Sequence, residues 1–119
     1  MVLKLKDNQI VSYADMMAAM GIEQRLHIMR LLLTTHPEGM VVGDIQAELD
    51  IPGSTLSYHL EKLKIVGLVN VKRESQFMRY SANTGALQKL LAFLFDECCS
   101  RNNAIEPQTI ANLCMIDKG

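Results

Sequence analysis

Three cysteines carry the most distinctive chemistry in this chain. Cys98 and Cys99 are adjacent, and Cys114 follows near the C-terminus. An odd number of cysteines, in a small chain with 49% hydrophobic residues, does not indicate a disulfide framework, so we expect free thiols in a reducing compartment. Thiolates favour soft, thiophilic ions over harder metals. The competing interpretation is burial, because free cysteine also packs as a small apolar side chain.

A second group of polar side chains is interleaved with leucines at helical spacing, Leu56, Leu60 and Leu63. A helix would bury the leucines on one face and expose short hydrogen-bonding groups that can approach base edges, together with a cation for a phosphate. A core histidine, a packing aromatic and a simple helix cap are the alternatives for single members of the set. Its members are Ser54, Thr55, Ser57, Tyr58, His59 and Lys62.

Charge is distributed unevenly along the chain. The net charge of the whole chain is −1, but residues 1–52 carry −3, residues 53–80 carry +3 and residues 81–119 carry −1. A basic segment in an otherwise acidic chain indicates contact with a polyanion on one face and argues against indiscriminate coating of nucleic acid. Within this segment, further groups suited to the DNA backbone or the minor groove are Lys72, Arg73, Gln76 and Arg79.

The elements that must position these residues follow from hydrophobic periodicity. Apolar residues at helical spacing predict two helices, one over residues 10–20 and one over residues 22–33, and a third, shorter helix carries Val42, Ile45 and Leu49 on its inner face. The fourth helix carries the leucine row, with Gly53 or Ser54 as its cap, and ends near Gly67. A loop at His36–Gly39 precedes the third helix.

After Gly67 the apolar period changes from nearly four to two, which predicts a β-hairpin. Its strands are residues 68–73 and 77–81, joined by a polar turn. Asn83 or Thr84 caps a last helix with Leu87, Leu91, Leu94 and Cys98 along one side.

These elements predict a mainly α winged helix-turn-helix fold with a β-hairpin wing. A length of 119 residues fits one domain, which we place at residues 1–103 and follow with a flexible tail at 104–119. No apolar run approaches the ~18 residues of a membrane span, and no secretory signal is visible, so we expect a cytoplasmic protein without a membrane partner.

The sequence also resembles the ArsR/SmtB family of winged-helix repressors. The matching positions fall roughly between residues 20 and 100. They are residues 21–26, 43–45, 48–49, 54–63, 67–69, 73–74 and 79–81.

The resemblance implies a homodimer, paired through the first and last helices, that sits on pseudo-palindromic double-stranded operator DNA and leaves it when an inducer binds. The residues support a dimer independently, because Met16-Met17 and Phe93-Leu94-Phe95 provide more apolar surface than a small core can cover.

Family members differ in where they bind the inducer. Val41-Val42-Gly43 lacks the Cys-Val-Cys of one metal-sensing class, and the last helix has no histidine for the zinc site of another. The cysteines instead resemble an arsenic-responsive subset with a vicinal pair at the end of the last helix and a third cysteine close by. The resemblance therefore implies trivalent arsenic, arsenite or an organoarsenical, on Cys98, Cys99 and Cys114. Cys114 lies farther from the pair than is usual, and without it the two remaining thiolates suit an organoarsenical.

The sequence thus predicts an operator-binding repressor that arsenic releases from DNA, with no catalytic cofactor. The alternative is a redox or reactive-sulfur sensor that uses the same cysteines. An enzyme is not expected, because the chain has no Cys-x-x-Cys, no phosphate-binding Gly-rich loop and no catalytic triad spacing.

Overall fold

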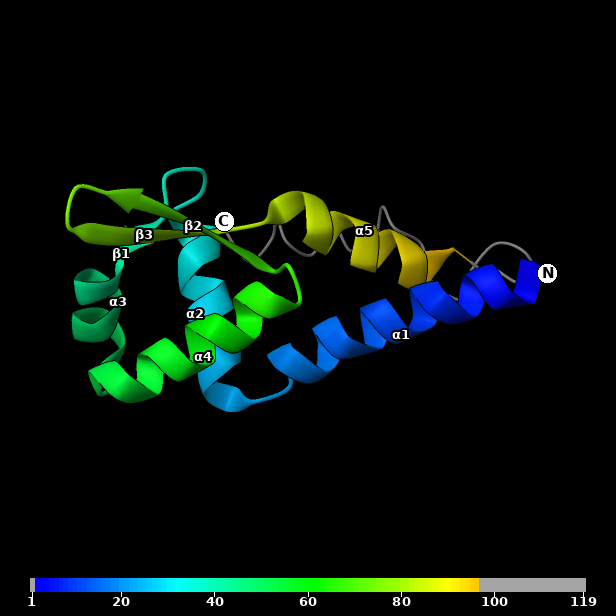
Figure 1. The fold of residues 1–119 in the computed structure, drawn as a ribbon, viewed down its shortest axis with the longest axis horizontal. Helices are drawn as coiled ribbons and strands as arrows, with labels where there is room; N and C mark the ends of the chain where they lie inside the picture. The colour runs from blue at the N-terminus through cyan, green and yellow to red at the C-terminus, as the bar shows by residue number, and fades with distance from the viewer. Residues whose placement is uncertain (1, 97–119) are drawn as a thin grey trace, which may run out of the picture. The chain divides into compact units, whose positions relative to one another are not determined.

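The computed structural model describes residues 2–96, with side chains from Asn8 onward. In this range the predicted winged helix-turn-helix fold is confirmed (Figure 1). The chain divides into two compact units, one up to Ala86 and one from Leu87. The elements in chain order are α1 (Val2–Met20), α2 (Glu23–Thr34), β1 (Met40–Val41), α3 (Val42–Leu49), α4 (Gly53–Ile65), β2 (Val69–Glu74), β3 (Phe77–Ala82) and α5 (Thr84–Phe95).

The core of the first unit is aliphatic. The leucine row predicted for the fourth helix is confirmed, since the side chains of Leu56, Leu60 and Leu63 are completely buried in α4. Burying one such side chain stabilises the fold by about 1.5–3 kcal/mol, so this row holds α4 firmly on the rest of the unit. The other fully buried large side chains are Ile28, Met29, Leu32, Ile45 and Leu68.

The apolar row that predicts α2, Ile22, Leu26, Met29 and Leu33, is only partly its buried face, because Met29 is the one member that is buried. Leu26 is 49% exposed and Leu33 is 37% exposed. The inner face of α2 lies one position away, where Arg25, Ile28 and Leu32 are buried. The spacing correctly predicts the helix, but a helix with apolar residues on two sides does not reveal which side meets the core.

The ends of α4 differ from each other in how they are closed. The predicted cap at Gly53 or Ser54 is wrong: Pro52 is the N-cap, and no side chain caps this end. The predicted end near Gly67 is confirmed. Gly67 has φ of +83°, its N–H donates to Lys64 O, and Leu68 N–H donates to Leu63 O. This is the Schellman arrangement, in which glycine adopts the left-handed conformation without a steric penalty.

The wing is one strand larger than the sequence predicts. The antiparallel sheet has the order β1-β3-β2, and β1 pairs Met40 with Tyr80. Two residues are too few to show a period of two, so the sequence pattern cannot reveal this strand. The hairpin itself is confirmed, with a tight turn at Ser75 and Gln76 in which Ser75 has φ of +59°. The sheet contacts α2, α3 and α4 (Figure 1).

The last helix begins as predicted. Asn83 Oδ1 accepts a hydrogen bond from Ala86 N–H at 3.2 Å, and Asn83 Nδ2 donates to Gly67 O at 2.8 Å. Within α5, Leu90 is buried, whereas Leu91 and Leu94 are 45% and 49% exposed. The predicted boundary at residue 103 lies outside the described residues. Within residues 2–96, none of the helices combines the length and apolar character that a membrane crossing requires.

Candidate nucleic-acid interface

The face of α4 opposite its leucine row is polar and accessible. Ser54, Ser57, Tyr58 and Lys62 are exposed there, and Thr55 is half-buried. The first turn of the helix carries no acidic residue. A phosphate or a base edge can therefore approach this end of α4 without meeting a carboxylate, and the partial positive charge of the helix N-terminus adds to the attraction.

His59 does not belong to this exposed face, so the expectation that it is exposed is wrong. Its side chain is only 6% exposed and lies against the first turn of α2. Arg25 Nε donates a hydrogen bond to His59 Nδ1 at 3.1 Å, and His59 Nε2 lies 2.8 Å from Gln24 Oε1. Both ring nitrogens are thus occupied by protein partners. His59 connects two helices of the protein rather than reaching for a base.

The hydrogen bonds also define the tautomer of this histidine. Because Nδ1 accepts from Arg25, the ring proton resides on Nε2 and is donated to Gln24. Burial lowers the pKa of His59 below its ordinary value of 6.5, and the adjacent Arg25 cation lowers this pKa further. The imidazole is therefore neutral at physiological pH.

Tyr58 is the exposed aromatic of the polar face, and two cations lie close to its ring. Its ring is 56% exposed, with the Arg25 guanidinium carbon 5.6 Å and Lys62 Nζ 5.3 Å from the ring centroid. Contacts of this kind contribute about 0.5–1 kcal/mol at exposed sites. They hold the phenol ring and the Lys62 ammonium together as one polar surface.

Arg25 and Gln24 are the site residues that the sequence analysis missed. A signal was present: Arg25 precedes the buried Ile28 and Leu32 by three and seven residues, so it lies on their face of the helix. A charged residue at such a position needs a partner when buried. That partner, His59, lies 34 residues away in the sequence.

The register of the hairpin divides the predicted wing residues between two faces. Side chains alternate across a strand, so the neighbours Lys72 and Arg73 point to opposite sides. Val69, Val71 and Arg73 lie on one face of the hairpin, together with their respective cross-strand partners Ala82, Tyr80 and Met78.

This face is the one that α4 covers. Val69 and Ala82 are each 3% exposed. Burial raises the pKa of Tyr80 above its ordinary value, and the nearby carboxylate of Glu61 in α4 raises this pKa further. Arg73 therefore extends the helix-covered face toward the tip of the wing, where it is exposed and its Nε donates to Ser75 O at 3.3 Å. Gln76 is exposed in the turn.

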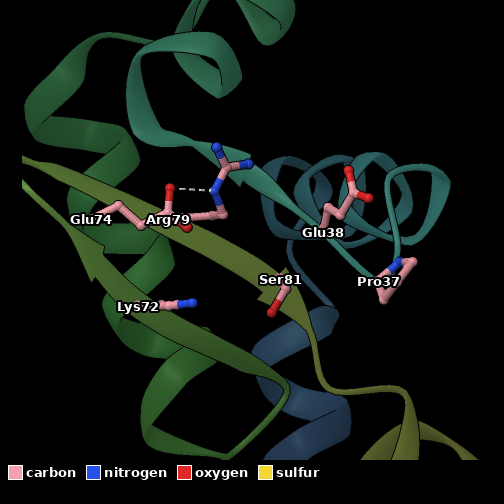
Figure 2. A pocket seen from close by; sticks show the side chains of 6 residues that line it. All are labelled: Pro37, Glu38, Lys72, Glu74, Arg79 and Ser81. Carbon is pink, nitrogen blue, oxygen red and sulfur yellow. Dashed lines mark hydrogen bonds and ion pairs between the residues drawn. The ribbon is translucent and has the colours of Figure 1, made fainter.

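The opposite face of the wing holds Lys72 and Arg79. Arg79 Nε is 2.9 Å from Glu74 Oε1, and Arg79 also donates to Gly39 O at 3.3 Å. Its side chain is 33% exposed, so Arg79 is partly committed to contacts within the protein. This face borders an open hollow of about 440 Å³, seen in Figure 2, that is lined by Pro37, Glu38, Lys72, Glu74, Arg79 and Ser81.

The three predicted thiolate ligands, Cys98, Cys99 and Cys114, lie outside the described residues. Residues 2–96 contain no group of three or more histidine, cysteine, aspartate or glutamate side chains arranged to hold a metal ion.

Known proteins are similar to this chain in sequence and in architecture. A family described as a helix-turn-helix domain matches residues 20–72. Nodulation protein NolR of Rhizobium meliloti is 32% identical over 97 residues, which cover 82% of this chain and 77% of NolR. The transcriptional activator HlyU of Vibrio cholerae is 31% identical over 87 residues, which cover 73% of this chain and 78% of HlyU.

Solved structures of transcriptional regulators are also similar to this chain. An ArsR-like transcriptional regulator from a Rhodococcus species has the same fold at 20% identity, with a TM-score of 0.67 over 93% of this chain and 94% of that one. HlyU of Vibrio cholerae in its reduced form is 29% identical, with a TM-score of 0.62 over 81% and 97% of the two chains. A homodimeric winged helix-turn-helix DNA-binding domain from Mycobacterium bovis, described as a possible ArsR-family regulator, is 27% identical, with a TM-score of 0.61 over 79% and 87%.

The polar helix, the wing beside it and these relatives define a winged-helix transcriptional regulator rather than an enzyme. Two relatives exceed 30% identity over more than two thirds of their own length. The chain belongs to the ArsR/SmtB family of such regulators.

Proposed function

We propose that this protein is a homodimeric repressor that binds operator DNA through α4 and the wing and leaves it when trivalent arsenic binds Cys98, Cys99 and Cys114. The observation that carries the DNA-binding part is the polar, acid-free first half of α4, exposed beside the Arg73 face of the wing. In this arrangement α4 is the recognition helix in the major groove, and the wing contacts the flanking backbone.

A homodimer is supported by the apolar surface of two helices. Ile10, Val11 and Met17 of α1 are 47–59% exposed, and Leu91 and Leu94 of α5 are similarly accessible. The related Mycobacterium bovis domain is homodimeric. A two-fold dimer places two recognition helices on two half-sites, so one short helix per subunit suffices.

The inducer part of the proposal is supported by the donor set. Three thiols match the preference of trivalent arsenic for sulfur, and each thiol that displaces a hydroxyl of arsenous acid forms an As–S bond and releases one water. The inducer can weaken DNA binding only as far as it binds the DNA-free state more tightly, typically by about 1–3 kcal/mol.

The test is a titration of a DNA duplex selected by the wild-type protein, in a reducing buffer with and without arsenite or phenylarsine oxide. Wild-type protein should lose affinity with the arsenical. Cys98→Ser and Cys99→Ser variants should bind DNA normally but ignore the arsenical, whereas unchanged wild-type affinity refutes arsenic sensing. Phenylarsine oxide needs two thiols and arsenite three, so a Cys114→Ser variant that responds only to the former identifies Cys114 as the third ligand.

A redox-sensing repressor is the second candidate. It is favoured by the related HlyU, whose structure was solved in a form described as reduced. That description implies that HlyU also has an oxidised form. Oxidation of two thiols to a disulfide needs an oxidant such as diamide. A disulfide between adjacent cysteines is strained, so a bond from the pair to Cys114 is required. Release of DNA by diamide, but not by arsenite under reduction, selects this function.

A further inference from the structure

Arg25 and His59 are the polar side chains buried among the described residues, with exposures of 7% and 6%. They form a hydrogen bond with each other, between the first turn of α2 and the middle of α4. Most other residues that attach α4 to the first unit are leucines, whose contacts are not directional. The hydrogen bonds of His59 to Arg25 and to Gln24 are therefore directional connections between the recognition helix and α2, and only the bond to Arg25 joins two buried side chains.

Arg25 connects three elements at once. Its Nε donates to His59 Nδ1 of α4, one of its terminal nitrogens donates to Ala19 O near the end of α1 at 3.4 Å, and its guanidinium lies over the Tyr58 ring. The planar guanidinium fixes the directions of its donors, which a lysine ammonium cannot do. The exposed Tyr58 and the last turn of α1 thus share one buried side chain.

We propose that Arg25 is a positioning residue for DNA recognition, which sets the rotation of α4 and the direction of Tyr58 relative to α1 through neutral His59. This inference rests on the proposed function, because α1 is there a dimer helix and α4 the recognition helix. A connection between them links the spacing of the two half-sites to the orientation of the groups that contact bases.

The connection requires neutral His59. A protonated ring has no acceptor at Nδ1, so the Arg25 Nε–H would face a second donor and a second positive charge. The groups that face His59 are Gln24 and Arg25 from α2 and Tyr58 on its own helix, with Lys62 beyond the tyrosine ring. None of them supplies a carboxylate that would stabilise an imidazolium. DNA affinity is therefore expected to fall on acidification.

The experiment begins by selecting a probe. Wild-type protein selects duplexes from a library with a randomised centre of about 30 base pairs, enough for two half-sites a helical turn or more apart. Affinity for the selected duplex is then measured for wild type, Arg25→Lys, His59→Gln and His59→Asn. Arg30→Lys is the matched control, because Arg30 is an exposed arginine on the same helix. Circular dichroism and urea unfolding identify variants that are not folded at the assay temperature.

Arg25→Lys should weaken binding about tenfold or more while remaining folded, since it loses the directed hydrogen bond to a buried acceptor. Arg30→Lys should change affinity less than about twofold, as surface substitutions normally do. His59→Gln retains an acceptor and a donor without a titratable ring, so it should bind at neutral pH and lose the fall in affinity between pH 7.5 and 5.5. His27 and His36 are exposed, so a His27→Gln/His36→Gln variant should keep that fall.

The outcomes distinguish a failure of the proposed function from a failure of the positioning role of Arg25. If wild-type protein selects no duplex, the proposed function fails. If wild-type protein binds but folded Arg25→Lys binds as tightly as Arg30→Lys, only the positioning role is refuted. The positioning role is also refuted if folded His59→Gln, or His59→Asn should the glutamine variant not fold, keeps the wild-type pH profile.

Discussion

The division of the wing into two faces predicts that its arginines contribute unequally to DNA binding. Arg73 lies on the face covered by α4 and is exposed at the tip, whereas Arg79 lies on the other face and is paired with Glu74 at 2.9 Å. If α4 enters the major groove, the phosphates beside it face Arg73. Replacing Arg73 by glutamine should therefore remove a phosphate contact, while removing the Arg79–Glu74 pair should not.

The magnitude follows from counterion release. Each phosphate contact contributes about 0.9 to the slope of log affinity against log salt concentration, and a two-fold dimer makes every contact twice. Arg73→Gln, and likewise Lys62→Gln on α4, should lower this slope by about 1.8. The double variant Glu74→Gln/Arg79→Gln removes two opposite charges, leaves the net charge unchanged and should preserve the slope.

The assay is fluorescence anisotropy on a selected duplex at several KCl concentrations between about 50 and 200 mM, where such slopes are well defined. Arg30→Gln removes a positive charge from exposed α2 and controls for the effect of net charge. If the double variant loses as much slope as Arg73→Gln, the two faces of the wing contribute equally to DNA binding and the prediction is refuted. A loss for Arg30→Gln of the same size would show that the slope reports overall charge rather than local contact.

Three further predictions concern stability. Leu60→Ala removes a fully buried side chain and should lower the free energy of unfolding, measured in urea, by about 2–5 kcal/mol. Ile65→Ala, at a site 67% exposed, should lower it by less than about 1 kcal/mol, and similar losses for the two variants would place Leu60 outside the core. Gly39→Ala should destabilise the protein by more than about 1 kcal/mol, because Gly39 has φ of +77° and a Cβ there would overlap a backbone carbonyl of β3. Gly43→Ala, in a helix with open space around the added Cβ, should be neutral or slightly stabilising, and equal thermal midpoints for the two variants would contradict this prediction. Because the pKa of His59 is lowered in the folded protein, the neutral ring makes its full contribution to the free energy of unfolding above the ordinary histidine pKa of 6.5. This contribution is lost as the pH falls toward the folded-state pKa, so the free energy of unfolding should be lower at pH 5.5 than at pH 7.5, and His59→Gln should reduce the difference. A difference of unchanged size in the variant would show that other groups cause it.

Local patterns in the sequence were sufficient for most of the fold. The spacing of Leu56, Leu60 and Leu63 identified a helix and its buried face, because residues three and four positions apart share one side of a helix. The change to a period of two located the wing, and Asn83, one of the two expected caps, does cap the last helix. These features depend on neighbours within a few residues, whose side chains share a face by backbone geometry alone.

The two-residue strand β1 and the inner face of α2 were decided by tertiary structure. Met40 joins the sheet because Tyr80 lies beside it, and Arg25 faces inward because the Nδ1 atom of His59 accepts its hydrogen bond there. The same holds for His59, which lies next to the leucine row and was equally compatible with the exposed face of α4.

The sequence by itself therefore determined the winged-helix architecture, the basic segment at residues 53–80 and the helix that carries the row of polar groups. Tertiary structure decided which of the polar side chains predicted to contact DNA are accessible. His59 of α4 is buried and hydrogen-bonded to Arg25 and Gln24, and Arg79 of the wing is paired with Glu74. The physical reason is that periodicity describes the faces of one element, whereas a buried polar group is stabilised by a partner at a distance along the chain that no local pattern encodes.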